Sequence, residues 1–323
     1  MARKTTKRIL IALGVAGLLG ALWLTAVVVS EFSGGFSTRG TSAADFEEEY
    51  LETGSSGDKI AMINLVGEIF SDPQNTARGA SDTNIITRLR HAADDPAVTG
   101  IILNLETPGG GVLASDSIYQ AVREIREEMP VVALMGNVAA SGGYYIAAGA
   151  TEIVAHPYTW TGSIGVIATI PNVEEAAGKL GVTMNVIKSG ELKDLGSPFR
   201  PLTDQESQIF QGLIDEAYAG FVEIVAEGRG LSLERTRELA DGRIYSGLQA
   251  KELGLIDHLG DRDTAFERAK SLADSPEASL VVYRPIIGLL EALNPFAISS
   301  PADEVVEELG LLRNPGASYL WIP

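Results

Sequence analysis

Short β-branched apolar runs alternate along the chain with longer segments in which apolar residues recur at helical spacing. The helical segments are TNIITRLRHAADD and the stretch from Ser115 to Met129. The runs that predict strands around them are KIAMINLVGEIF, VTGIILNLE and PVVALMG. This βαβ alternation is typical of parallel strands joined by crossover helices. The pattern therefore predicts an α/β fold.

The second half of the chain continues the same alternation. EIVAHP, GSIGVIA and MNVIKSG indicate further strands, and a long helix is expected from about Thr203 to Glu227, with shorter helices beyond Ser232. Past Tyr283, five prolines interrupt the apolar runs, so the pattern becomes irregular there.

The N-terminus predicts a membrane anchor. Residues 1–8, MARKTTKR, are basic, and residues 9–29 form an uncharged apolar run long enough to span a bilayer. The run ends without a convincing pair of small residues for signal cleavage, so we expect it to be retained. Basic residues before it and acidic ones after it place the N-terminus in the cytoplasm and the rest of the chain outside.

These boundaries predict five parts. We expect a cytoplasmic basic N-terminus over 1–8, an anchor over 9–29 and a flexible acidic tether over 30–58, which is rich in Gly, Ser, Thr and acids. A single catalytic domain should occupy 59–275, and a C-terminal extension should occupy 276–323.

Composition excludes several classes of function. The 43 acidic and 25 basic residues give a net charge of −18, which disfavours nucleic-acid partners. The absence of cysteine excludes disulfides, thiolate catalysis and Cys-ligated zinc. The three histidines have no metal-ligand spacing. We therefore expect no metal and no cofactor.

Two glycine clusters follow predicted strands, TPGGG at 107–111 and ASGGYY at 140–145. Strand-to-helix turns of this kind bind ligands in parallel α/β folds. Glycine allows backbone N–H groups to approach a substrate, and acyl transfer needs such donors where negative charge develops. Gly110 and Gly142 are the candidate oxyanion amides. Ser141 starts the second cluster and is the candidate nucleophile, although serine is also a common helix N-cap.

The general base is harder to assign from the residues alone. His91 and His258 have no clear route to Ser141, whereas His156 remains a possible partner. A lysine can serve instead if burial keeps it neutral. Lowering a lysine pKa from about 10.4 to about 7 or 8 costs about 3 to 5 kcal/mol.

Five segments together resemble the short, single-domain form of signal peptide peptidase A, a serine peptidase of the ClpP/crotonase-like superfamily. In chain order they are ETPGGGV, MGNVAASGGYYIAAGA, TGSIGVI, IKSGELKDLGSPFRPLT and DGRIYSGLQAKELGLID. The resemblance covers about residues 59–273. It implies a ClpP/crotonase-like fold of repeated β-β-α and βαβ units.

The resemblance also assigns the site residues. It implies that Ser141 is the nucleophile, that Lys193 is its general base and that Ser163 hydrogen-bonds the lysine amine. It implies an oxyanion amide in the PGGG segment, which we assign to Gly110, beside the Gly142 amide. Lys188 is the main competitor of Lys193. The family further implies a ring-like homo-oligomer in which adjacent protomers supply the serine and the lysine.

The expected function is a membrane-anchored serine endopeptidase with a Ser-Lys dyad that degrades remnant signal peptides and similar apolar peptides. The catalytic domain would lie outside a bacterial-type cytoplasmic membrane. Three alternatives stay open: a related membrane protease with another protein target, a crotonase-like acyl-CoA enzyme, and a non-catalytic peptide-binding scaffold.

Overall fold

The computed structural model describes residues 46–72, 80–285 and 318–320. The predicted anchor over 9–29 lies outside the described residues. None of the helices in the described ranges is both long enough and apolar enough to cross a membrane.

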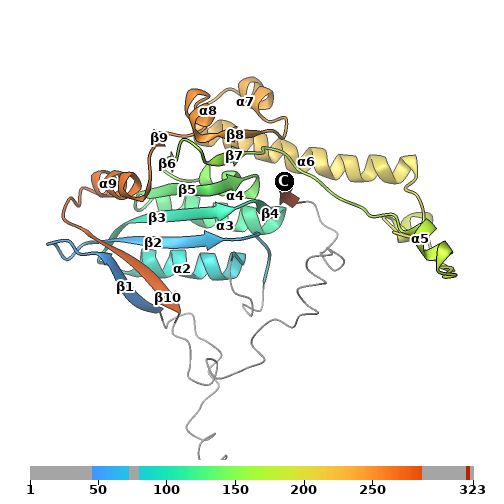
Figure 1. Cartoon of the computed structure of the whole chain (residues 1–323), viewed down its shortest axis with the longest axis horizontal. Coiled ribbons are helices and arrows are strands. Elements are labelled where there is room, and N and C mark those ends of the chain that lie inside the picture. Colours follow the sequence, from blue (N-terminus) through green and yellow to red (C-terminus); the bar gives the residue numbers. More distant parts are fainter. Residues whose placement is uncertain (1–45, 73–79, 286–317, 321–323) are drawn as a thin grey trace, which may run out of the picture. The chain divides into compact units, whose positions relative to one another are not determined.

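A nine-stranded, mainly parallel sheet forms the centre of the described chain (Figure 1). Its main path runs β1-β10-β2-β3-β5-β6-β9, and β7 and β8 branch from β5. Within this sheet, as far as the structure describes it, only β1 and β8 run antiparallel to their neighbours. The strands are β1 Phe46–Glu52, β2 Lys59–Val66, β3 Val98–Thr107, β5 Val131–Ala140, β6 Glu152–Ala155, β7 Trp160–Gly162, β8 Ile244–Ser246, β9 His258–Leu259 and β10 Ser279–Pro285. The predicted α/β sheet is confirmed.

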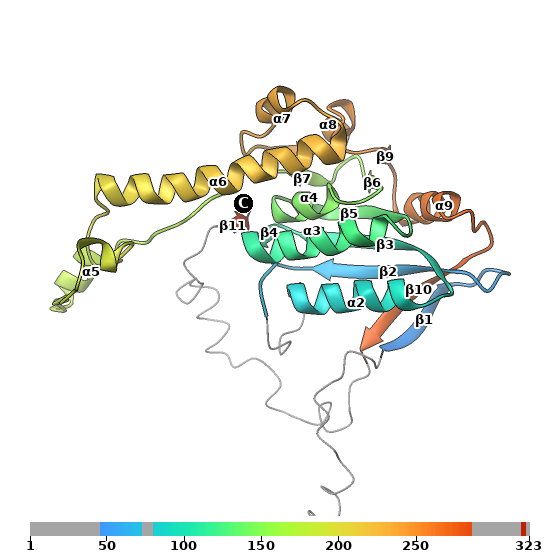
Figure 2. The same ribbon diagram turned by 180° about the vertical axis from the view of Figure 1, so that it is seen from behind.

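Helices cover both faces of the sheet (Figures 1 and 2). Helices α2 (Asp82–Asp94), α3 (Val112–Arg126) and α4 (Gly142–Ala147) lie on one face, and α9 (Arg262–Leu272) lies on the other. Alternate residues of β3 serve the two layers, because Ile101 and Leu103 pack in the first core and Ile102 in the second. Burial on both faces explains why these strands are continuous apolar runs.

The remaining helices follow β7. They are α5 Glu174–Lys179, a 3-10 helix Glu191–Asp194, α6 Asp204–Arg229, α7 Leu233–Leu239 and α8 Gly247–Glu252. The long helix predicted from about Thr203 is confirmed as α6. The side chain of Thr203, the N-cap residue, accepts the Glu206 N–H and completes a capping box, which explains where the helix begins.

Two strands lie outside the expected limits of the catalytic domain. β1 falls in the segment expected to be a tether, and β10 falls in the expected C-terminal extension. β10 pairs in parallel with β2 through Leu280 to Val282, which are buried, and β1 pairs with β10. The many acidic residues of this segment led to the prediction of a solvated tether. In the structure Glu48 instead forms an ion pair with Lys59, with 2.7 Å between Oε1 and Nζ.

The segment MNVIKSG does not form the predicted strand. Residues 182–188 have no strand partner, and Val186 and Ile187 are exposed. An apolar β-branched run becomes a strand only when another strand accepts its hydrogen bonds. The predicted strand GSIGVIA is similarly shorter than expected, because β7 ends at Gly162 and residues 163–166 are not part of a strand.

An irregularity in β5 sets the direction of its last residues. The register with β3 shifts between Leu105 and Thr107, and β5 exchanges its neighbour β6 for β7. The Glu106 carboxylate accepts the N–H groups of Asn137 at 2.7 Å and Val138 at 3.3 Å in the shifted segment. A Cβ atom at residue 136 would lie 2.1 Å from Glu106 Oε2, so a side chain there would displace the carboxylate that holds this segment.

Candidate active site

Ser141 lies where β5 ends and α4 begins. Its N–H donates to the Gly162 carbonyl at 2.8 Å, and its side chain is 1% exposed. Although Ser141 occupies the N-cap position, its side chain makes no capping hydrogen bond with α4. The capping role that could explain a serine here is therefore absent, and the hydroxyl is free for another task.

The backbone of Ser141 adopts an unusual conformation, with φ 55° and ψ −116°. Side chains with a Cβ atom rarely occupy this region, and such residues cluster at functional sites, where surrounding structure holds the strain. The strand-to-helix junction thus fixes the direction of the Ser141 side chain.

The two predicted glycine clusters meet beside this serine. A Cβ atom at Gly142 would lie 3.2 Å from the Gly110 nitrogen and 3.3 Å from the Gly109 Cα. Gly110 belongs to β4 (Gly109–Gly111) and packs so closely on Ile69 that any side chain would collide with the Ile69 backbone. Only glycine fits at these contacts.

The direction of the Gly110 amide follows from the strand geometry. The N–H of Gly111 donates to the Ile69 carbonyl at 2.8 Å. Successive N–H groups of a strand point to opposite edges, so the Gly110 N–H points away from Ile69. Within the described ranges, neither the Gly110 nor the Gly142 amide has a hydrogen bond to a loop or cap group. The Gly110 N–H therefore lies on the edge of β4 that pairs with β11 (Ser318–Leu320), where Tyr319 stands opposite Gly110, and it can donate to a substrate oxygen where that pairing opens.

Ser163 emerges next to Ser141. Strands β5 and β7 pair in parallel with Ala140 opposite Gly162, so the following residues, Ser141 and Ser163, leave the sheet side by side. Ser163 also has positive φ, at 49°, is buried, and donates its N–H to the Arg243 carbonyl at 2.8 Å. The structure thus brings together four of the five predicted site residues: Ser141, Ser163, Gly110 and Gly142.

A short strand near the C-terminus covers the glycine strand. β11 (Ser318–Leu320) pairs antiparallel with β4, with Tyr319 opposite Gly110, and it lies against α3 and α4. This edge of β4 thus accepts an extended strand by main-chain pairing, the way in which a peptide would bind in place of β11.

Lys193, the fifth predicted residue, lies on a separate structure, which we call the arm and define as residues 167–220. The arm comprises the segment with α5 and the 3-10 helix together with the N-terminal half of α6. Figures 1 and 2 show the segment between α5 and α6 at the end of α6 remote from the sheet. Glu206 is the only buried residue of the arm. Within one chain, Lys193 is not brought to Ser141.

The arm distinguishes the two competing lysines. The Lys188 ammonium donates to Asp194 Oδ1 at 2.7 Å and to the Glu191 carbonyl at 2.8 Å. Lys193 is exposed, and its amine has no hydrogen bond or ion pair with any residue that the structure describes. Lys188 is therefore committed to a structural ion pair, whereas Lys193 is available to a partner.

Arg200 connects the turn that carries Lys193 to α6. Its guanidinium donates to the Asp194 side chain at 3.0 and 3.2 Å and to Glu206 at 2.5 and 2.8 Å. Hydrogen bonds from Arg200, then from Lys188, hold the pKa of Asp194 well below its usual value. Arg200, followed by the Thr203 N–H, lowers the pKa of Glu206 to about 2. Both carboxylates remain charged, and the turn is fixed on the helix.

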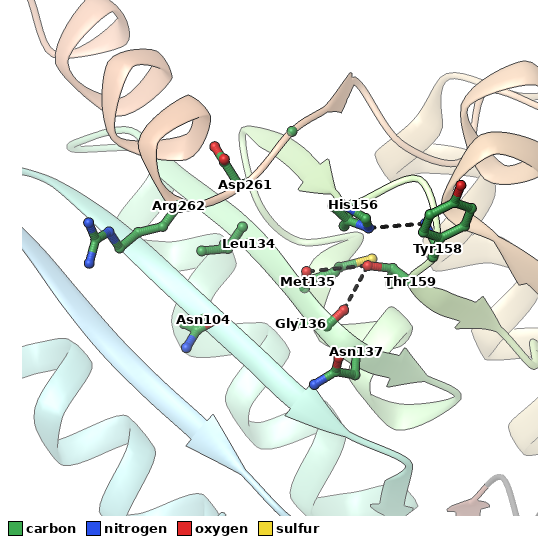
Figure 3. A pocket seen from close by; sticks show the side chains of 11 residues that line it. Asn104, Leu134, Met135, Gly136, Asn137, His156, Tyr158, Thr159, Asp261 and Arg262 are labelled. Carbon is green, nitrogen blue, oxygen red and sulfur yellow. Dashed lines mark hydrogen bonds between the residues drawn. The ribbon is translucent and has the colours of Figure 1, made fainter.

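A cavity of about 300 Å³ lies apart from these residues, on the face of the sheet that carries α9 (Figure 3). His156 lines it, and its Nδ1 accepts the Tyr158 N–H at 3.3 Å. None of the predicted site residues lines this cavity. Across the described ranges, no group of three or more His, Cys, Asp or Glu side chains could hold a metal ion.

Sequence reasoning missed two residues beside the site, Glu106 and Ser115. Glu106 holds the shifted segment of β5 that leads to Ser141. Ser115 lies on the buried face of α3, against Gly142. The signal for Ser115 was available, since it shares a helical stripe with Ile118 and Val122, where a polar residue is unusual.

Comparison with known proteins identifies relatives over most of the chain. The profile of peptidase family S49 matches residues 123–275, and that of Clp protease matches residues 57–159. A protein of Enterococcus faecium named "Putative signal peptide peptidase SppA" is 37% identical over 244 residues, which cover 74% of this chain and 71% of that protein. "Putative protease slr0021" of Synechocystis is 42% identical over 219 residues, covering 68% and 76%. Protease 4 of Haemophilus influenzae is 35% identical over 232 residues, covering 72% and 37%.

Proposed function

The chain belongs to peptidase family S49, and from that premise we propose that it is a membrane-anchored serine endopeptidase with a Ser141–Lys193 dyad. Its substrates would be remnant signal peptides and similar apolar peptides. The observation that carries the proposal is the junction at Ser141. There a buried serine, free of any capping role, is held at positive φ beside two glycine amides.

The proposed reaction begins when the neutral Lys193 amine takes the Ser141 proton as Oγ attacks a peptide carbonyl. The Gly110 and Gly142 amides stabilise the oxyanion. The protonated lysine then gives its proton to the leaving amine, which leaves an acyl-serine. Lys193 next deprotonates water, which attacks the ester and releases Ser141. Ser163 orients the lysine amine by a hydrogen bond.

A second protomer would supply the lysine. Burial favours the neutral amine that a base requires, and the exposed side chain of Lys193 needs a partner surface to provide it. The arm also exposes apolar side chains, which favours its association with another copy of the chain. The exposed apolar residues of the arm are Ile167, Leu180, Val182, Met184, Val186, Ile187, Leu192, Leu202, Ile209 and Leu213. We therefore propose a homo-oligomer with shared active sites.

Strand addition supports an extended peptide as substrate. In the structure β11 occupies an edge of β4, so a peptide that replaced β11 would be held by the same main-chain pairing beside Ser141. An anchor over residues 9–29 would keep the site at the outer face of the membrane, where the apolar segments of cleaved signal peptides remain. The peptide main chain gives affinity, and small residues at the cut would fit the tightly packed junction.

Three alternative functions are compatible with the same fold. A membrane protease with a different protein target shares every residue named above and differs only in substrate. A crotonase-like acyl-CoA enzyme would use the glycine amides without the serine and lysine. A peptide-binding scaffold would need neither.

The test is cleavage of a synthetic signal-peptide-like substrate by the detergent-solubilised full-length protein. The wild type should cut, and Ser141→Ala and Lys193→Ala should be inactive while remaining folded. Lys188→Ala is the matched control; it retains Ser141 and Lys193 and should still cleave the substrate. An active Ser141→Ala variant contradicts the assignment, and an inert wild type favours the scaffold or acyl-CoA readings.

Mixing the two inactive variants tests the shared site. If a neighbour supplies the lysine, co-assembled Ser141→Ala and Lys193→Ala chains contain some sites with both residues intact. Activity should then return to part of the wild-type level after the subunits exchange. A mixture that assembles but stays inactive would show that serine and lysine come from the same chain.

A further inference from the structure

Ser115 is buried against Gly142, and its hydroxyl has no partner among the residues that the structure describes. It lies in the second turn of α3, which begins directly after the glycine strand β4, and its side chain is 0% exposed. Within the described residues its Oγ makes no hydrogen bond. Buried hydroxyls are nearly always paired, so this one requires an explanation.

Its position relates it to both glycine amides. The Oγ atom lies 2.5 Å from the point where a Gly142 Cβ would stand, and the Gly110 nitrogen lies 3.2 Å from the same point. The hydroxyl thus occupies the space that the missing side chain of Gly142 leaves, next to the N–H of Gly110. Ser115 is therefore part of the glycine junction beside Ser141.

Packing alone does not explain a serine here. The other buried residues of α3 that face the same core, including Ile118 and Val122, are apolar. An alanine would fill the site and avoid the cost of an unpaired buried hydroxyl. A helical serine often bonds the carbonyl four residues earlier, but Ser115 makes no such bond. Its donor remains unused in the free protein.

We propose that the Ser115 hydroxyl is a third oxyanion donor, in addition to the amides of Gly110 and Gly142. This inference rests on the proposed function, because it assigns a role within the same site. As Ser141 Oγ attacks, the π electrons of the scissile carbonyl move onto its oxygen. The Ser115 O–H hydrogen-bonds the resulting oxyanion and keeps its own proton throughout.

The variant Ser115→Ala should combine two opposite changes. Its kcat for a signal-peptide-like substrate should fall on the order of 10- to 100-fold with KM nearly unchanged, because the donor acts on charge that develops only in the transition state. Its Tm should be equal to or above that of the wild type, because the variant no longer buries an unpaired hydroxyl. Ser115→Cys, which keeps only a weak donor, should fall between the two in kcat.

A peptide aldehyde provides an independent readout. The aldehyde forms a hemiacetal with Ser141 whose oxygen occupies the oxyanion position. Its inhibition constant should rise in Ser115→Ala by a factor similar to the loss of kcat/KM. Ser81→Ala is the matched control, since Ser81 is a buried serine that caps α2 by accepting the Asn84 N–H at 3.3 Å. That variant should lose stability and keep its kcat.

Three results would overturn the inference. A Ser115→Ala enzyme with wild-type kcat shows that the hydroxyl is not a donor. Losses of kcat and Tm together, with unchanged binding of the aldehyde, show that Ser115 only supports the fold. If Ser141→Ala still cleaves, the proposed site itself is wrong and the role of Ser115 falls with it, a result that differs from the first two.

Discussion

The positive φ of Ser141 predicts that the Ser141→Gly variant is more stable than the Ser141→Ala variant. Both Ser141→Gly and Ser141→Ala remove the hydroxyl, so they differ only in backbone freedom and one methyl group. A side chain in the region of φ 55° and ψ −116° costs about 1 to 3 kcal/mol, which glycine avoids. Glycine loses about 0.5 to 1 kcal/mol more than alanine through the entropy of the unfolded chain.

The difference leaves a net advantage of about 1 kcal/mol for glycine. For a domain of this size, that corresponds to a Tm about 2 to 4 °C above that of Ser141→Ala. Thermal unfolding of the two full-length variants in the same detergent, followed by circular dichroism, measures it. Because both variants lack the proposed nucleophile, neither should cleave the other during heating.

Ser207, exposed in the first turns of α6, supplies the control. It has helical backbone geometry, so Ser207→Gly should be less stable than Ser207→Ala by up to about 1 kcal/mol. The order of the two variants should therefore reverse between positions 141 and 207. If Ser141→Ala is at least as stable as Ser141→Gly, the junction is not strained and the reasoning fails.

Three further predictions concern the arm, the glycine strand and a buried ion pair. Arg200→Lys cannot hold Asp194 and Glu206 with one planar group, so peptide cleavage should fall at least about tenfold while α6 stays helical by circular dichroism. Removal of residues 318–323 frees β4, so KM for a peptide should fall, and an unchanged KM would show that β11 does not compete. Burial alone would raise the pKa of Asp257, but the hydrogen bonds and charge of Arg229 have the larger effect and lower it. The ion pair therefore stabilises the fold above about pH 4, and this stabilisation is lost as the pH falls through the lowered pKa. Asp257→Asn should cost about 1 to 3 kcal/mol at pH 7 and flatten the acid limb of the stability curve measured by urea unfolding; an equally steep limb would contradict this.

The parts of the site that follow from local rules could be predicted from the sequence. Parallel strands place their carboxyl ends at one edge, so the clusters that follow VTGIILNLE and PVVALMG had to lie close together. The contact between Gly110 and Gly142 and the junction at Ser141 agree with that expectation. The sheet interior was also visible, because strands covered on both faces are uniformly apolar.

The parts that depend on distant partners could not be predicted. β1 becomes a strand only because β10, more than 200 residues later, accepts its hydrogen bonds. Residues 182–188 carry a similar β-branched pattern and stay outside the sheet, because no strand accepts theirs. The position of Lys193 relative to Ser141 could not be predicted either, because in the proposed oligomer it depends on how the arm contacts another protomer.

The ion pairs of Arg200 have a consequence for the thermodynamics of assembly. They fix the Lys193 turn on α6 within the single chain, so this part of the arm would lose little conformational entropy on docking in the proposed oligomer. Association of a preformed arm should therefore show the negative heat-capacity change of apolar burial without the additional change that coupled folding produces. Calorimetric dilution of the oligomer would then report an interface between rigid bodies.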